Sequence, residues 1–151
     1  MADRSTNDRG AGDRGSVLAL MPAALLVLLL LAAIAVDTTT EYLARRELAA
    51  AADAAANDAA TFGLDEARFR ETGEFVLDAT RAEEAVRRAL AVRASVVVDH
   101  AAIDVTTDPD EGTVTVTLRS TAHLVFAPIV PGAPHDVDVV VRATADVYVG
   151  D

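Results

Sequence analysis

The sequence contains no cysteine, no lysine and no tryptophan, and only four phenylalanines and two tyrosines. Without cysteine the chain can form no disulfide, no thiolate nucleophile and no cysteine-based metal site. The shortage of aromatic residues means that its core is built from Val, Leu and Ala. Basic residues are also few: 13 Arg stand against 24 acidic residues, and the net charge is −11. We therefore expect no nucleic-acid partner, because binding nucleic acid requires a basic surface that neutralises phosphates.

One long apolar run extends from Ser16 to Val36, and its 21 residues carry no charge. As a helix it is about 31 Å long, which matches the hydrocarbon core of a bilayer. Two interpretations are open: a retained transmembrane helix, or a signal peptide cut at Ala33-Ile34-Ala35 to give a product that begins at Val36. The run is longer than a usual signal-peptide core and continues into a helix-forming segment. Both features favour the retained anchor.

The arginines around this run predict its orientation. Three precede it and two follow it: Arg4, Arg9, Arg14, Arg45 and Arg46. Positive charge favours the cytoplasmic side of a span. We therefore expect a cytoplasmic leader at 1–15, a transmembrane helix at 16–36 in the cell (inner) membrane, and an extracytoplasmic remainder.

An alanine-rich stem helix is expected at 37–62. Ten of the seventeen residues at 44–60 are Ala, the strongest helix former. Ala51 and Ala55, spaced at i and i+4, leave room for close approach by another element. That element is either the protein's own domain or a stem helix of another copy in an assembly, and the pattern allows both. Gly63 is expected to end the helix.

The sequence of the remainder, 63–151, predicts a small α+β domain. Thr80-Arg81-Ala82-Glu83 fits a capping box, and the apolar positions that follow it predict a short amphipathic helix at about 80–93. From Ser95 onward the apolar residues recur at every second position, which is typical of half-buried strands.

Four segments show this two-residue period: one around Ile103 and Val105, one at 113–118, one at Ala122, Leu124 and Phe126, and one from Val137 to Val149. The segment DPDEG at 108–112 predicts a turn, and APIVPGAP at 127–134 predicts a loop. We expect an antiparallel sheet of about four strands with one face in water. The short helix and the end of the stem would cover its apolar face.

No catalytic motif accompanies this pattern. His100, His123 and His135 lack metal-ligand spacing, and the acidic residues at 108–111 fit a solvated turn and not a calcium loop. The nucleophile elbow, the phosphate-binding loop and the dinucleotide fingerprint are missing. We therefore expect no enzyme activity, no metal site and no cofactor.

Three short motifs resemble TadE/TadG-like proteins of Flp (tight-adherence) pilus systems. They are Asp13-Arg14-Gly15-Ser16 before the apolar run, Ala35-Val36-Asp37 at its end, and Ala52-Asp53-Ala54-Ala55-Ala56 in the stem. The order of apolar helix, alanine-rich helix and β-rich domain also fits that family.

The resemblance implies what this N-terminus does. Proteins of that family are similar to type IV pilins, in which a prepilin peptidase cuts after a glycine at the cytoplasmic face. The matching residue here is Gly15, and Ser16 would become the new N-terminus. Pilins and TadE-type proteins carry Glu five residues after that glycine, where this chain has Leu20. This departure favours the TadG-type branch, which often lacks the Glu and stays anchored.

The resemblance thus implies a single-pass membrane protein that is an accessory or minor component of pilus assembly or secretion. Its expected partners are the membrane, other assembly proteins or copies of itself through the N-terminal helix, and a prepilin peptidase. The alternative from the residues alone is a small secreted binding or adhesion domain with a cleaved signal peptide.

Overall fold

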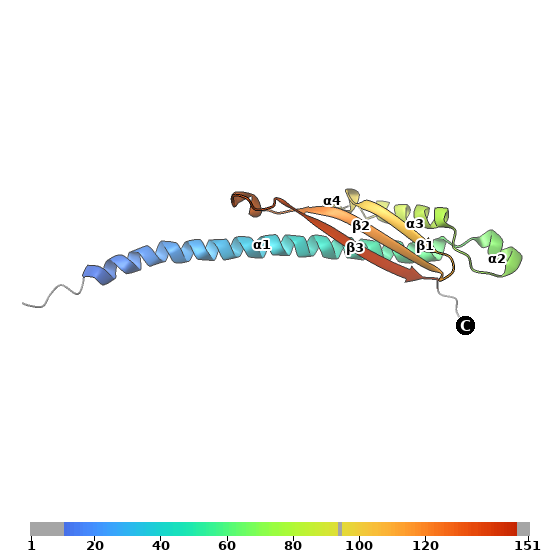
Figure 1. The fold of residues 1–151 in the computed structure, drawn as a ribbon, viewed down its shortest axis with the longest axis horizontal. Coiled ribbons are helices and arrows are strands. Elements are labelled where there is room, and N and C mark those ends of the chain that lie inside the picture. Colours follow the sequence, from blue (N-terminus) through green and yellow to red (C-terminus); the bar gives the residue numbers. More distant parts are fainter. Residues whose placement is uncertain (1–10, 94, 148–151) are drawn as a thin grey trace, which may run out of the picture.

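The computed structural model describes residues 11–93 and 95–147. Its largest element is one helix, α1 (Ala11–Phe62), which runs without interruption through both the apolar run and the alanine-rich stem. At 1.5 Å per residue this helix is about 78 Å long. Figure 1 shows its first half extending well beyond the rest of the protein. The prediction that the apolar helix continues directly into the stem is confirmed.

Three consecutive threonines at the junction of the two halves do not break the helix. The hydroxyls of Thr38, Thr39 and Thr40 each donate a hydrogen bond to the carbonyl four residues earlier, at 2.7 to 3.0 Å. This local bonding satisfies the hydroxyls within the helix itself. The β-branched cluster is therefore compatible with a continuous α1.

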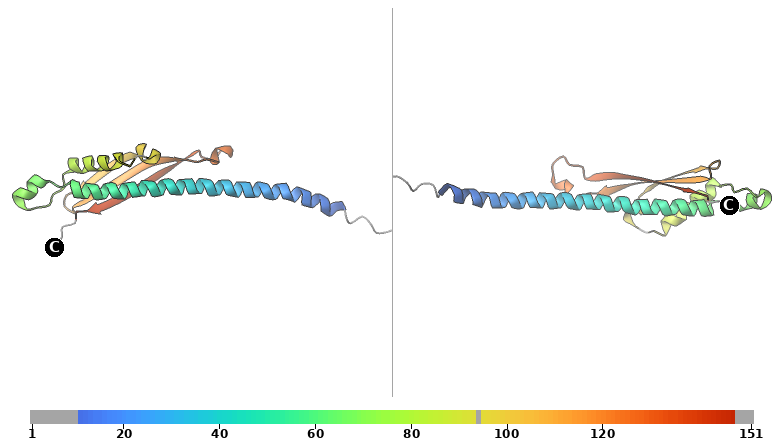
Figure 2. Two further views of the ribbon diagram at one scale, coloured as in Figure 1. Left: turned by 180° about the vertical axis from the view of Figure 1, so that it is seen from behind. Right: turned by 90° about the horizontal axis from the view of Figure 1, so that it is seen from below.

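A three-stranded antiparallel sheet lies across the second half of α1 (Figures 1 and 2). Its order is β1 (Ala102–Asp108), β2 (Thr113–His123) and β3 (Asp136–Asp146). The register sets Val114 opposite Ala145, and Val116 opposite Ala143. These apolar residues are buried on one face, while Thr115 and Thr144 pair their hydroxyls on the other at 2.9 Å. The sheet thus has the predicted dry and wet faces.

The stem helix is the main cover of the dry face, since α1 packs against both β2 and β3. The shorter helix α3 (Ala79–Ala91) packs against α1 and the β1 edge. The alanines on the inward side of the stem are buried, and so are the larger residues Leu48, Val86 and Leu118. Because alanine side chains are small, the helix and sheet come close together while the larger residues fill the space between them.

The expected strand count was wrong, because the structure has three strands in place of about four. Residues 113–118 and Ala122 belong to one long strand, β2, which ends at His123. Leu124 and Phe126, expected in a strand of their own, lie in the connection to β3, which includes the short helix η1 (Ala127–Ile129). The N–H of Phe126 is bonded to a carboxylate of α1 and so cannot join a strand ladder.

Two local predictions also need correction. The N-cap of α3 is Asp78 and not Thr80: the Asp78 carboxylate accepts from the N–H groups of Thr80 and Arg81 at 2.8 and 3.1 Å. Asp and Thr are both good N-caps, so the sequence signal is ambiguous here. The two-residue period does not begin at Ser95, because Ser95 caps a one-turn helix, α4 (Val96–Asp99).

The segment between α1 and α3 holds one more helix, α2 (Glu66–Thr72), within a loop closed by a bridge between Leu64 and Leu77. Gly63 ends α1 as predicted. A Cβ on Gly63 would lie 2.4 Å from the Ala59 carbonyl oxygen and 3.0 Å from the Ala82 Cβ. Only glycine therefore allows α1 and α3 to approach this closely.

Candidate functional site: the Asp37 clamp

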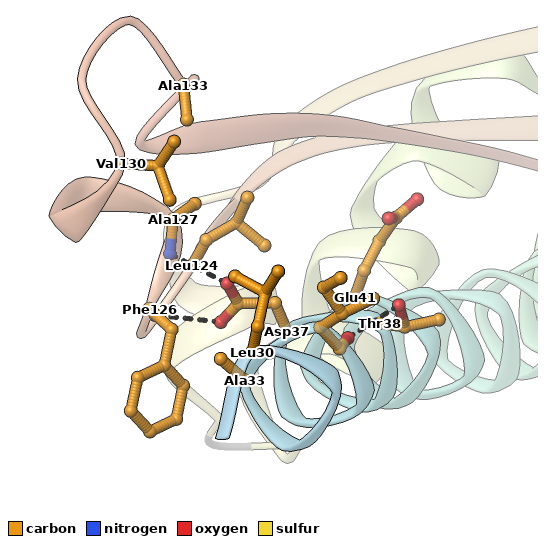
Figure 3. Close-up of a pocket in the computed structure, with 11 residues that line it drawn as sticks. Leu30, Ala33, Asp37, Thr38, Glu41, Leu124, Phe126, Ala127, Val130 and Ala133 are labelled. Atoms are coloured by element: carbon orange, nitrogen blue, oxygen red, sulfur yellow. Dashed lines mark hydrogen bonds between the residues drawn. The ribbon is translucent and has the colours of Figure 1, made fainter. Parts of the chain in front are cut away.

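The most distinctive contact in the structure joins α1 to the β2–β3 connection. Asp37 follows the apolar run directly, and α1 directs its carboxylate towards residues 124–135 (Figure 3). One carboxylate oxygen accepts hydrogen bonds from the N–H groups of Val125 and Phe126 at 2.8 and 2.9 Å. The other accepts from the N–H of Ala127 at 2.7 Å. We call these three bonds the Asp37 clamp.

These bonds favour the charged form of the carboxyl group. The N–H of Phe126 lowers the pKa of Asp37 most, and those of Val125 and Ala127 act in the same direction. Removal of water from the carboxyl group opposes them, but the net pKa lies below the ordinary value of 3.8. Asp37 is therefore ionised at neutral pH, and its charge is matched by three main-chain dipoles.

The clamp also completes the start of η1. The first N–H groups of a helix have no partner within the helix, and η1 has no capping side chain of its own. Asp37 supplies this cap from a helix 88 to 90 residues earlier in the chain. The base of the connection is closed by a second bond, from the Leu124 N–H to the His135 carbonyl at 2.9 Å.

A groove of about 290 Å³ lies between α1 and this connection. Leu30, Ala33 and Ile34 of the apolar run form one wall, and residues of the connection such as Phe126 and Val130 form the other (Figure 3). The groove is mainly apolar. Its polar lining residues are Asp37, Thr38 and Glu41. The Asp37 carboxylate is bonded to the three main-chain donors, and the Thr38 hydroxyl donates to the Ile34 carbonyl, so both have structural roles here.

The other residues singled out by the sequence lie at separate places along α1. Arg14, Gly15 and Ser16 are in the first turns of the helix, and their side chains fall outside the described set. Val36 is exposed beside Asp37. Asp53 is exposed on the outer side of the stem, where its main-chain carbonyl accepts from the Asn57 side chain.

Ala51 and Ala55, the candidate helix-packing residues, are buried in the protein's own core. Here they face the domain of the same chain and not the surface. Of the two arrangements that the sequence allowed for the stem, this structure contains the packing of the stem on its own domain.

Within the described residues, no group of three or more His, Asp or Glu is placed to hold a metal ion. The exposed His123, at the end of β2, forms a hydrogen bond with Asp136 at the start of β3, and the His100 ring forms one with the Val96 carbonyl. These histidines have structural partners close by in the chain or across the sheet.

Comparison with known proteins supports the predicted family for the N-terminal part. Residues 15–61 match the family described as Tad, putative Flp pilus-assembly TadE/G-like. The match covers the apolar run and the stem, and the described family is one of pilus-assembly components, not of enzymes. The resemblance predicted from the motifs at residues 13–56 is thereby confirmed for this segment.

The match covers TadE and TadG types together, so the TadG-type assignment stays a prediction. Searches of curated proteins and of solved structures gave no match.

Sequence reasoning identified Asp37 only as part of a family motif and missed its partners. A carboxylate immediately after an apolar run was visible, and so was an uncharged stretch from Leu124 to Pro134. Nothing in the sequence connects the two, because the clamp uses main-chain N–H groups that every residue except proline has.

Proposed function

We propose that this protein is a single-pass membrane-anchored accessory or minor pilin-like component of Flp/Tad-type pilus assembly or secretion, of the TadG-type branch. The N-terminus is cytoplasmic, and the α+β domain lies outside the inner membrane. The stem carries this domain directly above the membrane.

One observation carries this proposal: the family match falls on a helix whose first half is apolar and bare. In the described part of the chain, α1 from Leu20 onward is the one helix long and apolar enough to cross a membrane, and none of its most apolar stretch is buried by the protein. Exposed fractions of Leu26 and Leu29 are 66% and 62%. An apolar surface of this extent requires a bilayer or another protein to cover it.

The continuous helix supports a mechanical role. Because the span and the stem are one helix, and the stem is also the core of the domain, movement of the anchor is transmitted directly to the domain. The Asp37 clamp adds a second attachment at the junction. Such a unit is suited to holding an acidic domain at a fixed place beside other assembly proteins.

The bare half of α1 is the surface proposed for partners. The inward alanines of the stem pack against the sheet and α3, whereas all side chains described between Leu20 and Leu29 are exposed, and the apolar run meets the domain at the groove that Leu30 lines. Other pilus-assembly proteins or copies of this chain would therefore contact the N-terminal helix within the membrane. A prepilin peptidase would act at Gly15 and Ser16.

The test is the intact mass of the protein from its native cells, measured separately in membrane and soluble fractions. We expect a membrane species that retains the apolar run, either complete or beginning at Ser16. A start at Ser16 would identify prepilin-type processing, and loss of that species on Gly15→Leu substitution would assign the cut. A soluble species beginning at Val36 would overturn the proposal and support the secreted binding domain.

A further inference from the structure

The β2–β3 connection is a second exposed apolar element outside α1. From Leu124 to Pro134 the sequence LVFAPIVPGAP contains no charged and no polar side chain. We call residues 124–134 the apolar loop. Ile129, Val125 and Val130 expose 75%, 57% and 48% of their surface. Exposed large apolar residues gathered on one loop mark a contact surface more often than a freely solvated one.

The position of this loop relative to α1 is what makes it informative. It extends beyond the sheet and back along α1 towards the N-terminus (Figure 1). Its Val130 and Ala133 share the groove with Leu30, which lies inside the apolar run. Leu30 precedes Val36 by six residues, or about 9 Å along the helix. The loop therefore overlaps the last third of the proposed span and is not simply above it.

Most main-chain N–H groups of the apolar loop have hydrogen-bond partners within the protein, which suits a poorly hydrated environment. Main-chain N–H groups that approach the water-poor hydrocarbon region of a membrane need hydrogen-bond partners within the protein. Here Asp37 accepts three of them, and those of Ile129, Val130 and Ala133 bond to carbonyls within the loop. The polar side chains begin on either side of the loop, at His123 and His135.

We propose that the apolar loop is a second membrane contact, inserted into the interfacial region of the leaflet at the C-terminal end of the span. The occupant of its exposed surface is lipid: Ile129, Val125 and Val130 contact the boundary between headgroups and acyl chains, as interfacial apolar segments do. This inference rests on the proposed anchoring of α1. It adds that the domain touches the bilayer at two places, which fixes its rotation about the helix axis.

The absence of cysteine allows a direct test on the full chain. Single cysteines are introduced by Ile129→Cys in the loop, Leu28→Cys in the span and Asp110→Cys in the β1–β2 turn at the other end of the sheet. Each variant is labelled with an environment-sensitive NBD fluorophore and reconstituted in phosphatidylcholine/phosphatidylglycerol vesicles. The measurements are the emission maximum and quenching by lipids that carry a nitroxide on the upper acyl chain.

We expect the labels at Leu28 and Ile129 both to shift to the blue and to be strongly quenched by the nitroxide lipids, and the label at Asp110 to behave as in water. A quenched Leu28 label with a water-exposed Ile129 label would overturn the inference and leave the anchor intact. A blue-shifted but unquenched Ile129 label would also overturn it, because the loop would then contact protein and not lipid. Water exposure at both Leu28 and Ile129 would overturn the anchor as well.

Discussion

The two halves of α1 belong to one helix but meet opposite surroundings. From Leu20 to Val36 the side chains are apolar, mostly large and almost all exposed, whereas the inward alanines from Ala44 to Ala60 are buried against the sheet and α3. The half with the larger apolar side chains is the one that the protein leaves bare. Apolar character by itself therefore does not decide burial within the chain: small residues allow close packing on a sheet, and bulky leucines suit a lipid environment.

This difference separates two kinds of substitution. Changes in the first half should alter the association of the protein with membranes and leave the domain folded. Changes at the buried alanines of the second half should alter the stability of the domain and leave membrane association unchanged. Substitution of Asp37, at the junction, should change neither membrane association nor domain stability strongly, but it should loosen the apolar loop.

The largest effect is expected from placing charge in the first half. Replacing Leu28 and Leu29 together by Arg should oppose insertion by about 6 kcal/mol, because each Leu-to-Arg change near the centre of a span costs about 3 kcal/mol. The protein should move from the membrane pellet to the soluble or aggregated fraction after carbonate extraction. The matched control is Tyr42→Arg with Leu43→Arg, an exposed pair outside the span. Retention of the Leu28/Leu29 variant in the extracted membrane would contradict the anchor.

The next effect is expected from enlarging a buried alanine of the stem. Ala55→Leu should lower the free energy of unfolding by about 1–3 kcal/mol, because the added atoms have no room between the stem and the sheet. Denaturant unfolding of the detergent-solubilised protein, followed by circular dichroism, measures this change. Ala50→Leu, on the exposed side of the same helix, should leave the unfolding midpoint nearly unchanged. Equal stability of the two variants would mean that the stem does not pack on the sheet as described.

A smaller, local effect is expected at the clamp. Because the folded-state pKa of Asp37 is lowered, its contribution to stability is fully present above the ordinary value of 3.8 and is lost as the pH falls through the lowered value. Hydrogen-exchange protection factors of the amides at 125–127 should therefore fall on acidification in that range. Asp37→Asn should reduce this protection at neutral pH and remove its dependence on pH, since the amide has no charge and one of its ends is a donor. Unchanged protection in that variant would show that the clamp does not hold the loop.

The smallest effect is expected at Asp53, the family-motif residue on the outer side of the stem. Asp53→Ala should change the free energy of unfolding by no more than about 0.5 kcal/mol, because the side chain is exposed. Thermal unfolding checks this value beside Ala55→Leu. If Asp53→Ala is stable but no longer supports pilus assembly in cells, the outer face of the stem contacts a partner protein. If assembly is normal, Asp53 makes no contact that assembly requires.

Much of the architecture follows from patterns within short stretches of the sequence. The uncharged run predicted a long apolar helix, the alanines predicted its continuation, and alternation predicted the buried face that includes Val114 and Val116. These predictions succeed because helix and strand periodicity is set by local geometry. The N-cap of α3 was misplaced because the local signal is ambiguous, whereas the error in strand count arose where a distant residue intervenes. Leu124 and Phe126 have the two-residue period of a strand. The N–H groups at 125–127, however, donate to Asp37, and the chain leaves the sheet at this point.

The sequence by itself therefore determined which half of α1 is apolar enough to cross a membrane, where α1, α3 and the three strands lie to within a few residues, and which family the N-terminal helix resembles. Only the tertiary structure decided that the stem is covered by its own sheet and that Asp37 holds the apolar loop beside the apolar run. The physical reason is that composition and periodicity act between near neighbours, whereas the clamp is a contact across 88 to 90 residues made through main-chain groups that carry no sequence signature.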